Sequence, residues 1–392
     1  MAESYWETPS PDGIVNVMTA TSAALEQPLR PARAAWLERS LVDVGPNWFA
    51  SVMGTGIVAT AAGLLPTRSN ALHAFALSIW LLAAAMLVVL VAATAAHWLW
   101  YPANARRHLE NPAMAPFYGA PAMAFLTVGS GALLVGKGLL GSEAAVRVDF
   151  TLWSIGTALG LATAVVVPLL MFTTHDLRDG AQATWLMPIV PPMVSASAGA
   201  GLVAHLPEGQ PRLALLLACY TMFGLSLFAS LITITLLWAR LAAQHVGPAR
   251  LVPTLWIVLG PLGQSITAAN LLGAAATGVL PAFAPSIQAL GVLYGVATWG
   301  FAALWLAIAA AITARTAAKH LPFSLTWWSF TFPVGTVVTG TAELAIHTGA
   351  APLAWIADGL YAGLVAAWAA VTLRTLHGLV ITRRLAPIDP AD

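Results

Sequence analysis

The stretch LSIWLLAAAMLVVLVAATAA, residues 77–96, runs for 20 positions without a charged side chain. A helix needs about 20 mostly apolar residues to cross the hydrocarbon core of a bilayer. Comparable runs recur from about residue 47 to residue 380, and the 392-residue chain is 59% hydrophobic and only 8% charged. A soluble domain carries roughly 25% charged residues. We therefore expect lipid to surround most of this protein.

Ten apolar runs are long enough to predict an all-α integral membrane fold. Their approximate bounds are 47–65, 74–98, 114–136, 149–172, 184–204, 212–238, 253–278, 286–313, 324–347 and 353–374. If ten spans alternate in direction, 13 Lys and Arg residues fall on the side of the N-terminus and 4 on the opposite side. Positive charge concentrates on the cytoplasmic side of membrane proteins. This split predicts a multi-pass protein of the cell (plasma) membrane with both termini in the cytoplasm.

The predicted spans divide the chain into one membrane domain and two tails. We expect a polar cytoplasmic N-terminal tail over residues 1–43, a transmembrane domain over 44–380, and a cytoplasmic C-terminal tail over 381–392. The N-terminal tail has the polar composition of a disordered segment.

Proline marks the start of every odd-numbered span. Pro46, Pro116, Pro188, Pro253 and Pro322 follow one another at steps of 70, 72, 65 and 69 residues. A period near 70 is the length of one helical hairpin with its loops, so the pattern indicates five repeated hairpins. Proline is also common near the ends of membrane helices, which leaves coincidence as the alternative. Since every odd span crosses in the same direction, we predict a quasi-fivefold ring of hairpins around a central pore.

The odd spans carry polar and small residues through their interiors, whereas the even spans are apolar nearly all round. Polar groups at membrane depth usually face protein or water. Phe332, Thr336, Thr339 and Glu343 share one face of the ninth span at helical spacing. The residues that we expect to line the pore are Thr55, Thr127, Ser130, Ser195, Gln264, Thr267, Asn270, Thr336, Thr339 and Glu343.

The charge pattern of the odd spans favours an anion as the permeating species. Glu343 is the one acidic residue within them, so a cation filter built from a carboxylate ring is not expected. Five parallel helices would also direct five N-termini, each with about half a positive charge, at the cytoplasmic mouth. Prolines leave free carbonyls in the preceding turns, which would oppose this attraction if they face the pore.

Other functions have weaker support in the sequence. The nine histidines form no HExxH-type spacing with each other or with carboxylates, so we expect no enzyme, no metal site and no cofactor. The balanced charge of +1 and the missing basic block argue against nucleic acid as a partner. A proton-coupled dicarboxylate transporter remains open, because Glu343 and His347 form an i, i+4 pair that could relay protons.

Three segments resemble the tellurite-resistance/dicarboxylate transporter family. They are Pro46-Asn47-Trp48-Phe49 followed by Val52-Met53-Gly54-Thr55-Gly56-Ile57, the entry to the third span with Asn111-Pro112 and Phe117-Tyr118-Gly119, and Trp327-Trp328-Ser329-Phe330-Thr331-Phe332-Pro333. The similarity extends over about residues 44–380. The family includes the bacterial tellurite-resistance protein, fungal malate permeases and sulfite efflux pumps, and plant slow anion channels.

The resemblance implies a fold, a gate and a substrate class. It implies ten helices as five hairpins around a pore, often in a trimer, with a phenylalanine of the ninth helix closing the pore. The matching residue is Phe332, with Phe330 as the alternative. The implied substrates are small anions, namely sulfite or a C4-dicarboxylate such as malate, and the implied partners are membrane lipid and further copies of the chain.

Overall fold

The computed structural model describes residues 41–42, 44–177 and 180–379, and every regular element in this part of the chain is helical. The all-α class is therefore confirmed. The described residues from Val44 to Leu379 belong to one compact unit. Apart from Leu41 and Val42, the predicted tails at 1–43 and 381–392 lie outside the described residues.

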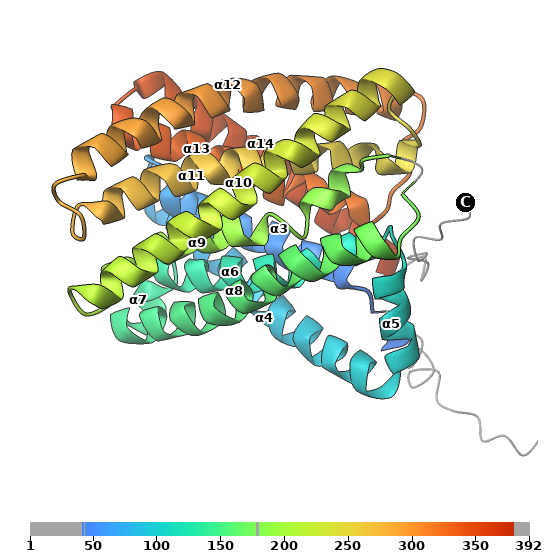
Figure 1. The fold of residues 1–392 in the computed structure, drawn as a ribbon, viewed down its shortest axis with the longest axis horizontal. Coiled ribbons are helices and arrows are strands. Elements are labelled where there is room, and N and C mark those ends of the chain that lie inside the picture. The colour runs from blue at the N-terminus through green and yellow to red at the C-terminus, as the bar shows by residue number, and fades with distance from the viewer. Residues whose placement is uncertain (1–40, 43, 178–179, 380–392) are drawn as a thin grey trace, which may run out of the picture. The chain divides into compact units, whose positions relative to one another are not determined.

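Five long helices of 27 to 35 residues alternate with five shorter ones (Figure 1). The long helices are α4 (Asn70–Trp100), α8 (Ser142–Thr173), α10 (Gln210–Gln244), α12 (Ala284–Ala317) and α14 (Ala351–His377). The shorter helices are α3 (Phe49–Leu64), α6 (Gly119–Leu134), α9 (Pro191–Val203), α11 (Leu259–Ala276) and α13 (Phe332–Thr348). Two brief helices, α5 (Pro102–Glu110) and α7 (Lys137–Leu140), lie in connections.

Burial separates these helices into an inner and an outer set. In the most apolar window of each long helix at most 28% of the residues are buried, whereas at least 67% are buried in the corresponding windows that contain α6, α9 and α11. The exposed side chains of the long helices include Val88, Phe172, Phe228 and Leu293, each at least 69% exposed. Such an apolar exterior suits lipid. We call the long helices outer and the shorter ones inner.

Eight helical stretches, rather than the predicted ten, are long and apolar enough to span a membrane in the described part of the chain. The two that fall short belong to the inner set: α3 has 16 residues and α13 has 17. The stretches that contain α6, α9 and α11 reach their lengths together with the 3₁₀ residues before these helices.

The inner helices contact one another in cyclic order. Contacts join α3 to α6, α6 to α9, α9 to α11, α11 to α13, and α13 back to α3. Each inner helix also packs against the outer helix that follows it in the chain, as α11 does with α12 (Figure 1). The core of the protein therefore lies among the five inner helices.

A 3₁₀ segment precedes every inner helix. These segments are η1 (Pro46–Trp48), η2 (Ala115–Tyr118), η3 (Ala183–Leu186), η4 (Ala249–Val258) and η5 (Leu325–Phe330). Proline fixes φ and has no N–H to donate, so it fits the first turn of a helix but interrupts a longer one. The prolines seen in the sequence thus lie in or close to the 3₁₀ segment before each inner helix.

Tryptophans of the outer helices form hydrogen bonds to the inner helices and to the 3₁₀ segments before them. The indole Nε1 of Trp80 donates to the Val128 carbonyl of α6 at 2.9 Å, and that of Trp153 donates to the Ser195 carbonyl of α9 at 2.8 Å. Trp305 donates in the same way to Leu255 of η4. A buried indole N–H needs such a partner, so these residues serve packing between helices.

Candidate functional site

Two cavities lie among the inner helices, one near their first turns and one near their last. The first, which we call the apolar cavity, measures about 20 Å³ and is lined by Ala50, Met53, Phe117, Met123, Met187, Val190, Ile257, Gly260, Leu325, Ser329, Phe332 and Pro333. The second, the polar cavity, measures about 120 Å³. All five inner helices contribute to the polar cavity, and each inner helix or the residues directly before it contribute to the apolar one. The five helices therefore run in the same direction.

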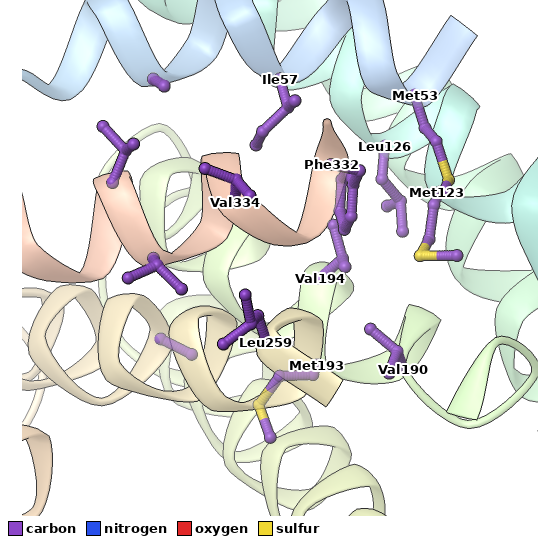
Figure 2. Packing of buried hydrophobic residues seen from close by; sticks show 14 of the residues in the cluster. Met53, Ile57, Met123, Leu126, Val190, Met193, Val194, Leu259, Phe332 and Val334 are labelled. Atoms are coloured by element: carbon purple, nitrogen blue, oxygen red, sulfur yellow. The ribbon is translucent and has the colours of Figure 1, made fainter. Parts of the chain in front are cut away.

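Phe332 is the residue that borders both cavities. It is the first residue of α13 and only 2% exposed. Figure 2 shows its ring near Leu126 and Met123 of α6 and Val194 of α9, with Met53 of α3 close by. The Phe332 side chain therefore lies between the two cavities.

Hydroxyl and amide groups line the polar cavity. Of the residues expected to line a pore, Thr127, Ser130, Gln264, Thr267 and Thr339 border it, and Thr60, Ser197 and Asp149 join them. The Gln264 side chain donates a hydrogen bond to Ser197 Oγ, which connects α11 to α9. Thr267 Oγ1 and Thr339 Oγ1 lie 2.7 Å apart and connect α11 to α13. These bonds fix the polar groups on three helices around one space.

The other predicted lining residues lie outside the linings of these two cavities, and each has a different neighbour. Thr55 accepts a hydrogen bond from Trp368 of α14, and Thr336 donates to the Leu259 carbonyl of α11. Asn270 lies against Gly295 of α12. Their side chains therefore serve contacts between helices.

Ser195 and Glu343 also lie away from the two cavities. The Ser195 carbonyl accepts the Trp153 hydrogen bond, and its own side chain is buried. Glu343 is buried near the end of α13, with its Oε2 3.6 Å from Nδ1 of His347.

Phe330, the alternative gate, lies in an aromatic cluster rather than on either cavity. Its ring centroid is 5.2 Å from that of Trp256 and 5.7 Å from that of Trp327, both in edge-to-face geometry. Edge-to-face pairs of this kind stabilise packing. Phe330 therefore packs between the 3₁₀ segments η4 and η5.

Asp149 is a site residue that sequence reasoning missed. It lies on the outer helix α8, so a search confined to the odd spans passed over it. The signal was present, because Asp149 is an acidic residue at the start of the predicted span 149–172, and ionisable residues within membrane helices usually mark function. In the described part of the chain, none of the residues that line the two cavities is Lys, Arg or His.

An apolar exterior, an inner set of parallel helices and a largely neutral, hydroxyl-lined cavity define a membrane protein that moves small polar solutes. The model of the voltage-dependent anion channel family (SLAC1) matches residues 43–376, most of the chain. The chain belongs to this family of anion transporters, which bears out the resemblance to tellurite-resistance/dicarboxylate transporters; its members are transporters and channels, not enzymes.

Relatives from fungi and archaea match over most of the chain. The sulfite efflux pump SSU1 of Trichophyton rubrum is 28% identical, over 86% of this chain and 88% of its own length. The uncharacterized transporter MJ0576 of Methanocaldococcus jannaschii is 26% identical, over 85% of this chain and 92% of its own. The sulfite efflux pump SSU1 of Candida albicans is 24% identical, over 80% and 68%.

Proposed function

We propose that this protein conducts small anions, with sulfite as the leading substrate, through a pore that Phe332 closes. The observation that carries the proposal is the position of Phe332 between two cavities that the inner helices enclose. In this proposal the five hairpins form a quasi-fivefold ring of ten membrane-crossing helices. The cyclic order of inner-helix contacts supports the ring.

The electrostatics of the inner helices suit an anion. Their N-terminal ends surround the apolar cavity, and each helix N-terminus carries roughly half a positive charge. The hydroxyls of Thr127, Ser197 and Thr339 donate to carbonyls of their own helices and can donate to an oxyanion by rotating away from them. Neutral donors of this kind bind an anion less tightly than a fixed cation would. A site of this kind allows an anion both to enter and to leave.

Sulfite is preferred over malate for two reasons. Relatives of this chain carry the name sulfite efflux pump, and sulfite is the smaller anion for a cavity of about 120 Å³. We further propose a trimer in the plasma membrane with both chain termini in the cytoplasm. The family resemblance supports the trimer, and the distribution of Lys and Arg supports the orientation.

Sulfite release from liposomes tests the proposal. We expect liposomes that contain the purified protein and internal sulfite to release sulfite into sulfite-free buffer, with a rate that a protonophore leaves unchanged at fixed membrane potential. Protein-free liposomes are the control. Release of potassium in place of sulfite, or no release of any anion, contradicts the proposal.

A proton-coupled dicarboxylate transporter is the second candidate, and the buried contact between Glu343 and His347 is its support. Because Glu343 lies outside the linings of both cavities, we expect Glu343→Gln to change anion flux by less than about twofold, equivalent to about 0.4 kcal/mol of barrier. The measurement is malate and sulfite flux with and without an imposed proton gradient. Loss of flux in Glu343→Gln together with collapse by a protonophore would favour the second candidate.

A further inference from the structure

Asp149 is the one residue of an outer helix in the lining of the polar cavity. It lies two turns into α8 and is 1% exposed. Its position follows from the close approach of α8 to α6. A Cβ atom added at Gly129 of α6 would lie 2.9 Å from Asp149 Oδ1, so the missing side chain at Gly129 leaves room for the carboxyl group.

Within the described residues, the Asp149 carboxyl group has no ion-pair or hydrogen-bond partner. Its Oδ1 is buried and makes no hydrogen bond. The two inner helices against α8 are α6 and α9, and neither contains a titratable side chain. An ionised carboxylate that is buried without a cation or hydrogen-bond donors costs free energy. Either a proton neutralises Asp149 or a solute in the cavity stabilises it.

The other charged and titratable side chains near α8 are exposed or have a partner of their own. On α8 itself, Arg147 and Glu143 form an exposed ion pair at 3.6 Å. Lys137, on α7, is exposed. On η2, the hydroxyl of Tyr118 donates to the carbonyl of Ala105. Asp149 is thus the titratable group that faces the polar cavity, which is otherwise lined by uncharged side chains.

We propose that Asp149 is a proton-dependent charge filter in the polar cavity. When the carboxyl group holds a proton from the adjoining aqueous phase, it is neutral and can donate a hydrogen bond to a monoanionic oxyanion beside Thr127 and Ser130. When it releases that proton, the carboxylate repels the anion across a few ångströms of low-dielectric protein. This inference rests on the proposed function, since it requires that anions enter the polar cavity.

Nitrate flux at different pH values tests the filter, because nitrate stays a monoanion throughout. We expect nitrate flux through the reconstituted full chain to rise as the pH on the side of the polar cavity falls from about 8 to about 5, by at most about tenfold per pH unit for one proton. In Asp149→Asn we expect flux to stay constant within about twofold over the same range. Asp149→Glu, which keeps the acid, should keep a pH dependence.

Glu343→Gln is the matched control, because it removes the other buried acid but leaves the cavity lining unchanged. It should show the pH dependence of the unmodified protein. An equal pH dependence in Asp149→Asn, or a pH-independent nitrate flux in the unmodified protein, overturns the filter while leaving anion conduction standing. Nitrate flux that equals that of protein-free liposomes, in the unmodified chain and in Phe332→Ala alike, overturns the proposed function and the filter with it.

Infrared difference spectroscopy supplies a second readout if Asp149→Asn fails to fold. The unmodified protein should show a protonated-carboxyl C=O band that appears as pH falls. The band should shift in Asp149→Glu and persist in Glu343→Gln. A band that is unaffected by Asp149→Glu would contradict the assignment.

Discussion

Phe332→Ala is expected to raise anion conductance by at least about tenfold, since tenfold corresponds to about 1.4 kcal/mol of barrier. The ring of Phe332 separates the apolar cavity from the polar one and is 2% exposed. An anion that passes a phenyl ring in a dry constriction loses hydration without gaining donors. Removing the ring joins the two cavities and lets water accompany the anion. Single-channel or planar-bilayer recording measures the change.

Phe330→Ala is the matched control for this experiment. Phe330 is an aromatic residue two positions earlier, but it packs on Trp256 and Trp327 and borders neither cavity. We expect it to leave conductance near the unmodified level and to affect stability instead. If Phe330→Ala raises conductance and Phe332→Ala does not, the gate is Phe330 and our assignment to Phe332 is wrong. If neither does, the proposed gate is refuted.

Gly263→Ala is expected to destabilise the packing of α11 against α13. A Cβ atom at this position of α11 would lie 2.4 Å from the backbone carbon of Thr336 and the backbone nitrogen of Val337 in α13. Backbone cannot move aside as a flexible side chain can, so the two helices must separate. Overpacking typically costs about 1–3 kcal/mol. We therefore expect Gly263→Ala to lower the melting temperature of the detergent-solubilised protein.

The same substitution should also disturb the polar cavity, because Gly263 is one turn from Thr267, whose hydroxyl contacts that of Thr339. Gly260→Ala is the control. Gly260 lies on the same helix, but an added Cβ there would meet no heavy atom within 4 Å. Equal melting temperatures for the two variants would show that α11 and α13 do not pack as closely as described.

The outer helices could be predicted well from sequence, because lipid contact requires long apolar runs. The run at residues 77–96 lies within α4, and each of the other even-numbered spans corresponds to one long helix. The starts of the inner helices were also accessible, since proline restricts where a helix can begin. Phe332 was the expected gate from the family resemblance and from its place on the polar stripe of the ninth span, and it borders both cavities.

The faces of the inner helices were harder to predict. In α3, 14 of 16 residues are buried, so nearly every position faces protein and periodicity does not distinguish the cavity from a neighbouring helix. The sequence therefore favoured Thr55, whereas Ile57 and Thr60 border the polar cavity. The same reason applies in α9, where Ser197 and not Ser195 lies at the cavity. A one- or two-residue shift turns a helical side chain by 100° or 200°.

Asp149 shows a different limit of sequence reasoning. Its helix is mostly exposed and apolar, which indicates lipid contact for the helix as a whole. Only the packing of α8 against the glycine-containing face of α6 brings this one side chain to the polar cavity. Such a contact between an outer and an inner helix depends on their rotation about their own axes, which composition does not determine.

The reversal potential of Phe332→Ala currents under a salt gradient tests the central claim most directly. With the purified variant in a planar bilayer and unequal potassium nitrate on the two sides, we predict a reversal potential close to the equilibrium potential of nitrate. Nitrate on one side is then replaced by a large organic anion. This replacement should abolish the current that nitrate carried from that side. A reversal potential close to the potassium equilibrium potential, unaffected by replacing nitrate, would contradict an anion pore.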